Sequence, residues 1–194
     1  MLDGGPRVLA FGDSLTAGYG LARAEAFPAR LEALLRAERP GASVVDAGVS
    51  GDTTSSALAR LPRVLSRLAA RPDLAIVELG ANDLIRRVPP SATQANLDVI
   101  LREFARCGIP VLLASFEPPA FLGDAVRGYA GIYARLGEAH GVPVHPFFPS
   151  GVMGHHAHVL RDRLHPNAAA IATVAVAILP AVLAAMDASR SGPA

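Results

Sequence analysis

Short apolar segments alternate with helical segments along almost the whole chain. A strand that is apolar at nearly every position is buried on both of its faces, which is typical of a parallel sheet. Because parallel neighbours are joined by crossover connections, the intervening helices cover both faces of that sheet. The pattern therefore predicts an α/β fold in a single domain over residues 1–194, with its core at about residues 7–187. The expected strands are 8–11, 42–47, 74–79, 109–115 and 142–145, and the expected helices are 22–38, 54–70, 91–107, 124–139 and 168–186.

The first expected strand leads directly into a turn that contains Ser14. Gly12 relaxes the backbone there, and Asp13 and Ser14 favour turns and helix starts. The second and third strands end in similar turns, which contain Gly51 and Asn82. Since ligands bind outside the carboxyl ends of parallel strands, these turns predict a shared site at one edge of the sheet. Taken alone, each residue is also explained as an N-cap or an ordinary turn residue.

Asp162 lies three residues before His165 near the end of the chain. A serine hydroxyl is a poor nucleophile until a base removes its proton, and a histidine oriented by a carboxylate is the usual base. At this spacing the Asp162 carboxylate can accept a hydrogen bond from Nδ1 of His165, which leaves Nε2 to face Ser14. The sequence thus predicts a Ser-His-Asp triad, and a surface pair without a catalytic role is the alternative.

Attack by a serine places negative charge on the carbonyl oxygen of the substrate, and preorganised donors stabilise that charge. Gly51 offers a backbone N–H with no side chain in the way, and Asn82 offers a side-chain amide. The backbone N–H of Ser14 completes the set. We therefore expect Ser14, Gly51 and Asn82 to form an oxyanion hole.

Four short blocks of residues stand in a fixed order along the chain: Gly12-Asp13-Ser14-Leu15, Gly51, Gly80-Ala81-Asn82-Asp83 and Asp162-Arg163-Leu164-His165. Together with the spacing of the expected strands, they resemble the four sequence blocks of the SGNH/GDSL hydrolases. The resemblance spans about residues 8–186. It implies a flavodoxin-like fold of three α/β/α layers, in which a mostly parallel five-stranded sheet carries helices on both faces.

The resemblance also implies a role for each residue that matches a block. Ser14 is the expected nucleophile and one oxyanion donor, and Gly51 and Asn82 are the other donors. His165 is the expected base, and Asp162 orients it. These roles agree with those suggested by the residue types themselves, and they require no cofactor.

Three further segments are similar to the bacterial branch of acyl-CoA thioesterases, lysophospholipases and arylesterases: Ser50-Gly51-Asp52-Thr53, Ala59-Arg60-Leu61-Pro62 and His165-Pro166-Asn167. Enzymes of that branch commonly carry a secretion signal. Here the first strand follows Met1 closely, with no room for the basic and apolar regions of a signal peptide. We expect a cytoplasmic protein, or a periplasmic or secreted one if a signal peptide has been removed.

Two loops that follow the fourth and fifth expected strands are rich in apolar residues. Apolar side chains at this edge would line a pocket for an acyl chain, which gains about 0.8 kcal/mol for each buried methylene. Packing against the end of the sheet is the alternative. The expected substrate-binding residues are Asp13, Phe116, Pro118, Phe121 and Phe148.

The charge and cysteine content argue against several other functions. The formal net charge is +1, and no basic cluster marks a surface for nucleic acid. All strong cations are arginine, which removes a phosphate-loop lysine or a Schiff-base lysine. The single cysteine, Cys107, permits neither an intramolecular disulfide nor a cysteine-based zinc site.

The last expected helix, 168–186, is apolar and long enough to cross a membrane. It is rich in alanine, which inserts weakly, and it contains Thr173 and Pro180. It also follows directly from the segment that contains His165. We therefore expect this helix to pack against the sheet, with no stable membrane span.

The histidines outside the triad are densest at His155-His156-Ala157-His158. A metal-dependent hydrolase is one reading of this run. Zinc requires fixed ligand geometry and supporting hydrogen bonds, which neighbouring loop histidines rarely provide together. We therefore expect solvated side chains and no functional metal site.

Together, these features predict a serine hydrolase that cleaves a small-molecule acyl ester or thioester. Within the same family, the alternative is a carbohydrate acetylesterase, which would prefer acetyl groups. From a different class, the alternative is a non-enzymatic doubly wound binding module. The first turn has neither a phosphate loop nor a Gly-x-Gly-x-x-Gly pattern to support that module. The sequence leaves the oligomeric state and the physiological ester open.

Overall fold

The computed structural model describes residues 5–116, 126 and 128–191. Its centre is a five-stranded sheet in which every neighbouring pair of strands is parallel, in the order β2-β1-β3-β4-β5. This is the flavodoxin-like strand order, so the expected fold class is confirmed. The strands are β1 (Arg7–Gly12), β2 (Ser43–Gly48), β3 (Leu74–Glu78), β4 (Val111–Ser115) and β5 (Val144–Pro146).

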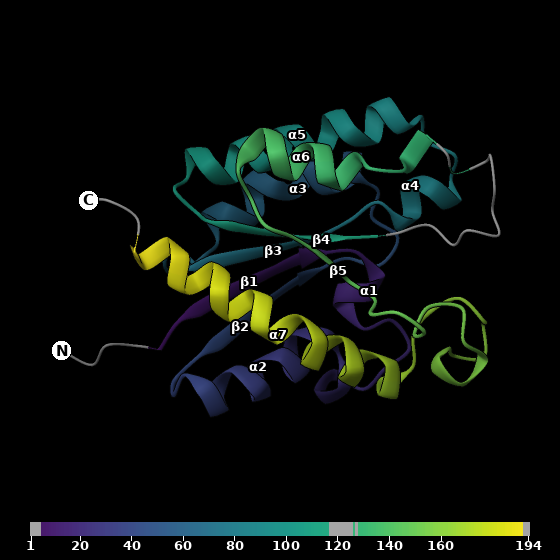
Figure 1. Cartoon of the computed structure of the whole chain (residues 1–194), viewed down its shortest axis with the longest axis horizontal. Helices are drawn as coiled ribbons and strands as arrows, with labels where there is room; N and C mark the ends of the chain where they lie inside the picture. The colour runs from purple at the N-terminus through teal and green to yellow at the C-terminus, as the bar shows by residue number, and fades with distance from the viewer. Residues whose placement is uncertain (1–4, 117–125, 127, 192–194) are drawn as a thin grey trace.

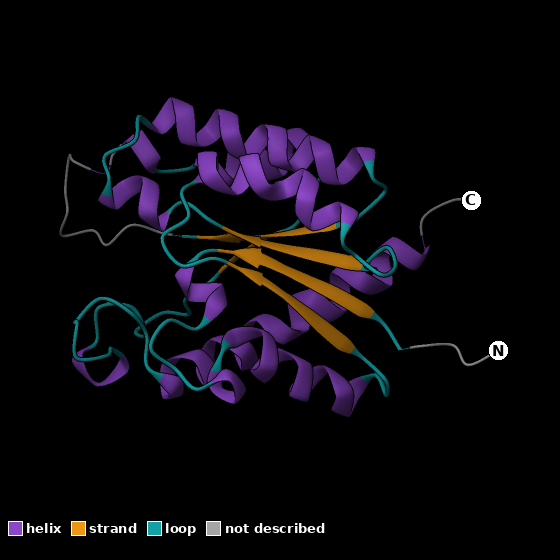
Figure 2. Cartoon of the chain, turned by 180° about the vertical axis from the view of Figure 1, so that it is seen from behind, coloured by secondary structure: helices purple, strands orange, loops and turns teal. Residues whose placement is uncertain are grey.

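Helices cover both faces of the sheet and give three layers (Figures 1 and 2). One face carries α2 (Phe27–Glu38) and α7 (Ala168–Ser191). The other face carries α3 (Thr54–Ser66), α5 (Pro90–Arg106) and α6 (Ile132–His140). Each layer of helices therefore has its own core against the sheet.

The alternation of side chains along β1 shows why its sequence is apolar throughout. Val8 and Ala10 pack into the core beneath α2 and α7, whereas Leu9 and Phe11 pack into the core beneath α3, α5 and α6. Phe11 meets Phe104 of α5 edge to face, with ring centroids 5.9 Å apart. Because both faces of this central strand are covered, all its apolar side chains lie out of water.

The helix α5 begins one residue before its predicted start at residue 91, although Ser91 and Gln94 have the spacing of a capping box. Pro89 is the N-cap, no side chain caps the helix, and Pro90 is its first residue. A proline at this position has a fixed φ that suits the first turn, so the helix begins before Ser91. A capping pair of this kind occurs instead on α3, where Ser56 Oγ accepts from Thr53 N at 2.9 Å.

Several other boundaries differ from the prediction. The predicted helix 22–38 divides into the 3₁₀ turn η1 (Arg23–Glu25) and α2, and α3 ends at Ser66, well before residue 70. The described part of the predicted helix 124–139 becomes regular only at Ile132, after Gly131 with a φ of +71°. The last helix continues to Ser191, five residues beyond the prediction of 186.

The helix α7 is long and apolar enough to span a membrane by composition, with a mean hydropathy of 2.4 in its most apolar window. In the structure it crosses the sheet diagonally (Figure 1). Ile171, Val174 and Ile178 are fully buried against the sheet. The packing expected for this helix is thus present.

Two short helices follow the carboxyl ends of the central strands: α1 (Ser14–Ala17) after β1 and α4 (Ala81–Ile85) after β3. Both lie in the right-hand half of the molecule in Figure 1. The strand order reverses between β1 and β3. In folds of this kind, that reversal is the usual position of a ligand site.

Candidate active site

The turn after β1 holds Ser14 at the first position of α1. Asp13 caps this helix, since its Oδ1 accepts a hydrogen bond from Leu15 N at 3.0 Å. Gly12 is required by the close packing, because a Cβ there would lie 2.1 Å from Thr16 Oγ1 and 2.6 Å from the Glu78 carbonyl oxygen. The sequence Gly-Asp-Ser therefore folds into a tight junction that presents the serine hydroxyl.

Ser14, His165 and Asp162 form a continuous chain of hydrogen bonds. Ser14 Oγ lies 3.1 Å from Nε2 of His165, and His165 Nδ1 lies 2.7 Å from Oδ2 of Asp162. With Nδ1 protonated, the imidazole donates to the carboxylate and Nε2 accepts from the serine hydroxyl. The structure thus brings the three predicted residues together across 151 positions of sequence.

The Asp162 carboxylate is held in its charged form. Its Oδ1 accepts from Leu164 N at 3.0 Å and from His165 N at 3.1 Å. The hydrogen bond from Leu164 N and then that from the His165 side chain lower the pKa of Asp162 to about 2. The group is therefore ionised throughout the pH range in which proteins are normally assayed.

Asn82 and Gly51 reach the same edge of the sheet from β3 and β2. One hydrogen of the Asn82 amide is donated to Oδ2 of Asp13 at 3.0 Å, which leaves the second hydrogen for another acceptor. Gly51 has a φ of +86°, a conformation that favours glycine. Among the residues that the structure describes, neither Gly51 N nor Ser14 N donates to an acceptor. Three donors therefore remain available at this edge.

Arg60 of α3 connects the Ser14 turn to the Gly51 turn. Its Nε donates to Oδ2 of Asp52, and its NH2 donates to the Gly12 carbonyl oxygen at 2.9 Å. The guanidinium also lies 4.4 Å from the ring centroid of Phe11. A single side chain thus bridges the Gly12 carbonyl oxygen and the Asp52 carboxylate, and so joins the two turns.

Two further links hold the Asn82 turn against the Gly51 turn. The buried Asp83 accepts from Thr54 N at 2.8 Å and from Thr54 Oγ1 at 2.6 Å. Arg86 donates to the Gly51 carbonyl oxygen at 2.8 Å. With the Asp13–Asn82 bond, these contacts join the three turns pairwise.

Two carboxyl groups are buried beneath Ser14. Burial raises the pKa of Asp13 to about 6, against hydrogen bonds from Leu15 and Asn82 that lower it. Burial, followed by the charge of Asp13, raises the pKa of Glu78 well above its usual range. Glu78 Oε2 accepts from Thr16 Oγ1 at 2.9 Å, while Oε1 has no hydrogen-bond partner among the described residues. Glu78 therefore holds its proton more tightly than an exposed glutamate.

Asp13, one of the expected substrate-binding residues, is buried. Its side chain is 0% exposed, and both oxygens are occupied by Leu15 N and Asn82 Nδ2. Asp13 thus supports the site from below. Phe116 and Phe148 are half-buried and pack against the core at this end of the sheet, whereas Pro118 and Phe121 lie outside the described residues.

Some residues of this edge carry no obvious signal in the sequence. Tyr19 stacks on the His165 ring with centroids 4.3 Å apart, and only its position between Gly18 and Gly20 marks it as unusual. Arg60 stands out only as part of the resemblance to one branch of the family. Arg86 resembles any surface arginine, because its partner Gly51 lies 35 residues away.

The histidine run does not form a metal site in the part of the chain that the structure describes. His155 stacks on His156 and lies beside His158, with centroids 4.9 and 5.0 Å apart. No group of three or more metal-ligating side chains occurs among the described residues. The rings of this run thus pack on one another, and His155 Nδ1 also accepts a hydrogen bond from Ala157 N at 3.2 Å.

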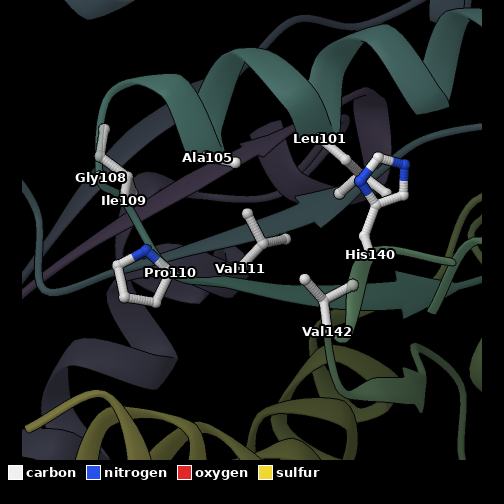
Figure 3. A pocket seen from close by; sticks show the side chains of 8 residues that line it. All are labelled: Leu101, Ala105, Gly108, Ile109, Pro110, Val111, His140 and Val142. Carbon is white, nitrogen blue, oxygen red and sulfur yellow. The ribbon is translucent and has the colours of Figure 1, made fainter. Parts of the chain in front are cut away.

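A cavity of about 270 Å³ lies far from Ser14, between α5 and the start of β4 (Figure 3). Its only titratable side chain is His140, whose Nε2 lies 2.7 Å from Oδ1 of Asp98. It brings no nucleophile near that histidine. The lining residues are Leu101, Ala105, Gly108, Ile109, Pro110, Val111, His140 and Val142.

Known proteins resemble this chain over most of its length. Residues 10–171 match the GDSL-like lipase/acylhydrolase family. The chain is 33% identical over 162 residues to the arylesterase of Vibrio mimicus, with 83% of this chain and 80% of that protein covered. It is 35% identical over 161 residues to thioesterase 1/protease 1/lysophospholipase L1 of Escherichia coli K12, with 82% and 75% covered.

A solved structure also resembles this chain over nearly its whole length. The crystal structure of AlinE4, an SGNH-hydrolase family esterase, is similar with a TM-score of 0.78 and 41% sequence identity. The similarity covers 95% of this chain and 98% of AlinE4. The family match and these relatives agree with the four sequence blocks and with the strand order of the sheet. The chain belongs to the GDSL-like lipase/acylhydrolase family, the SGNH hydrolases, and is a hydrolase.

Proposed function

We propose that the protein hydrolyses small carboxylic esters or thioesters through an acyl-enzyme on Ser14. The observation that carries this proposal is the chain of hydrogen bonds from Ser14 through His165 to Asp162, beside three free donors. A base within hydrogen-bond reach of the hydroxyl, and oriented by a carboxylate, is the arrangement that activates a serine.

In the first half of the reaction, Ser14 Oγ attacks the carbonyl carbon and His165 Nε2 takes the hydroxyl proton. The C=O double bond becomes a single bond, and its oxygen takes the negative charge. The tetrahedral intermediate then collapses, and the leaving oxygen or sulfur takes the proton from Nε2 as its bond to carbon breaks. The acyl group is left on Ser14.

The negative oxygen of the intermediate lies, in this proposal, among the N–H groups of Ser14 and Gly51 and the free hydrogen of the Asn82 amide. The links that Arg60, Asp83 and Asp13 make hold these donors in place before substrate arrives. Preorganised donors need no rearrangement as the charge develops, which is why they lower the barrier.

In the second half, water attacks the acyl carbon while His165 takes one of its protons. The intermediate collapses, the proton passes to Ser14 Oγ, and the carboxylic acid leaves. The ionised Asp162 stabilises the imidazolium that forms in both halves. All steps use side chains and backbone groups of this chain together with water.

Relatives named arylesterase and thioesterase/lysophospholipase support acyl esters and thioesters as the substrate class. The test is hydrolysis of p-nitrophenyl esters from acetate to laurate, with EDTA present. We expect activity from the wild type and from Ser91→Ala, a matched control on the exposed start of α5, but none from Ser14→Ala. Activity retained by Ser14→Ala would refute the mechanism, and cleavage of acetate alone would favour the acetylesterase alternative.

A further inference from the structure

Tyr19 presents an aromatic ring beside the proposed base. Its ring lies against His165 with centroids 4.3 Å apart and planes tilted by 33°. The side chain is 52% exposed. The ring is therefore accessible to a ligand bound beside His165.

The backbone holds this ring in place. Gly18 and Gly20 have φ angles of +74° and +73°, and Tyr19 N donates to the Ser14 carbonyl oxygen at 3.1 Å. A Cβ at Gly18 would lie 2.5 Å from Ala26 Cβ, and one at Gly20 would lie 2.7 Å from a methyl carbon of Leu160. The segment is therefore packed on both sides, and Tyr19 stands between two positions that need glycine.

Leu164 is a second exposed apolar residue at the proposed base. It directly precedes His165 and is 59% exposed. The Tyr19 hydroxyl has no hydrogen-bond partner among the described residues. The base thus stacks on an exposed aromatic ring and directly follows an exposed aliphatic residue in the sequence.

The proposed reaction indicates which part of the substrate lies beside His165. The leaving oxygen or sulfur receives its proton from His165 Nε2, so the leaving group must pass next to the imidazole. The carbonyl oxygen points away from it, toward Gly51 and Asn82. We propose that Tyr19 and Leu164 form a leaving-group subsite that favours flat apolar alcohols and thiols, such as the phenol of an aryl ester. This inference rests on the proposed serine mechanism.

The test compares two esters that share one acyl group, phenyl butyrate and methyl butyrate, by their kcat/KM values. Both give the same butyryl-enzyme, so only acylation distinguishes them. Tyr19→Ala should lower the phenyl-to-methyl ratio of kcat/KM about three- to tenfold, the size expected for an aromatic pair. Loss of support for His165 would slow methyl butyrate at least as much as phenyl butyrate, because the more basic methoxide depends more on the proton from His165, so it could not lower the ratio.

Two controls separate the ring from its hydroxyl and from general apolar surface. Tyr19→Phe keeps the ring and should leave the ratio within about twofold of the wild type. Ile85→Ala removes an exposed apolar side chain of α4, three residues after Asn82, and should not change the ratio. Leu164→Ala should lower the ratio in the same direction as Tyr19→Ala.

An unchanged ratio in Tyr19→Ala, with wild-type hydrolysis that depends on Ser14, would overturn the subsite and leave the serine mechanism standing. The same holds if Ile85→Ala shifts the ratio as much as Tyr19→Ala does. Ester hydrolysis that persists in Ser14→Ala would overturn the mechanism and the subsite together.

Discussion

Asp13 should contribute to turnover mainly by orienting Asn82, and two substitutions can test this together. The Asp13 carboxylate accepts one hydrogen of the Asn82 amide at 3.0 Å and thereby directs the other toward the substrate. Asp13→Asn keeps a side-chain oxygen that can cap α1 at Leu15 N, because asparagine is as good an N-cap as aspartate. It removes the charged acceptor that fixes Asn82.

The expected changes in kcat follow from the hydrogen bonds that each substitution removes. Removing an oxyanion donor costs about 10²–10³ in kcat, which sets the effect of Asn82→Ala. A hydrogen bond to a charged group contributes about 1.5–3 kcal/mol, so Asp13→Asn alone should lower kcat about ten- to hundredfold. In the Asn82→Ala background that loss should shrink to about threefold or less, since the amide is already absent. The loss of kcat that remains in this background reflects the charge of Asp13 acting on His165.

The assay is kcat for p-nitrophenyl butyrate near pH 8 in the wild type, the two single variants and the double variant. Circular dichroism and urea unfolding would show that all four proteins are folded at the assay temperature. If Asp13→Asn lowers kcat by the same factor in both backgrounds, Asp13 does not act through Asn82. Its effect would then arise from its charge beside His165.

Two more predictions concern stability. Arg60→Ala should lower the free energy of unfolding by about 2 kcal/mol, because it leaves Asp52 and the Gly12 carbonyl oxygen without their donor. Arg60→Lys should not restore this stability, since one ammonium group cannot donate to both acceptors with the geometry of a guanidinium. Coincident urea unfolding transitions for wild type and Arg60→Ala would contradict this. The unfolding free energy should also fall by roughly 2 kcal/mol as pH rises from about 4 to about 6, because Asp13 has a pKa of about 6 when folded and about 3.9 when unfolded, so the folded state binds more protons in that window. Urea unfolding at several pH values should show this slope in the wild type and a weaker one in Asp13→Asn, and equal slopes would refute the assignment. Asp162 acts in the opposite sense, and its stabilising contribution should be lost only as pH falls from about 4 toward 2.

The fold follows from the sequence where burial is complete. The segment that became β3 is apolar at four of five positions in Leu74–Glu78, and all five are buried, as the pattern requires of a central strand. The edge strands are harder to place, because β5 has only three residues and its Val144 is exposed. The prediction that α5 starts at residue 91 was wrong by one residue, because Pro90 suits the first helical position and the helix therefore begins before Ser91 can cap it.

The site could be predicted as far as its residues follow strands or lie close together in sequence. Ser14, Gly51 and Asn82 each follow a strand of a parallel sheet, so topology alone brings them to one edge. The links among the turns could not be predicted in this way. Arg60 reaches a carbonyl 48 residues earlier, and the pairing of Thr54 with Asp83 spans 29 residues.

The most direct test of the central claim is covalent labelling of Ser14. An organophosphonate ester bonds to a serine that is activated by a neighbouring base, and the modified residue is found by mass spectrometry of the digested protein. We expect one label per chain, on Ser14 in the wild type, none in Ser14→Ala, and much slower labelling in His165→Ala. Labelling at another residue, or an equal rate on Ser14 in His165→Ala, would contradict the proposed activation of Ser14 by His165.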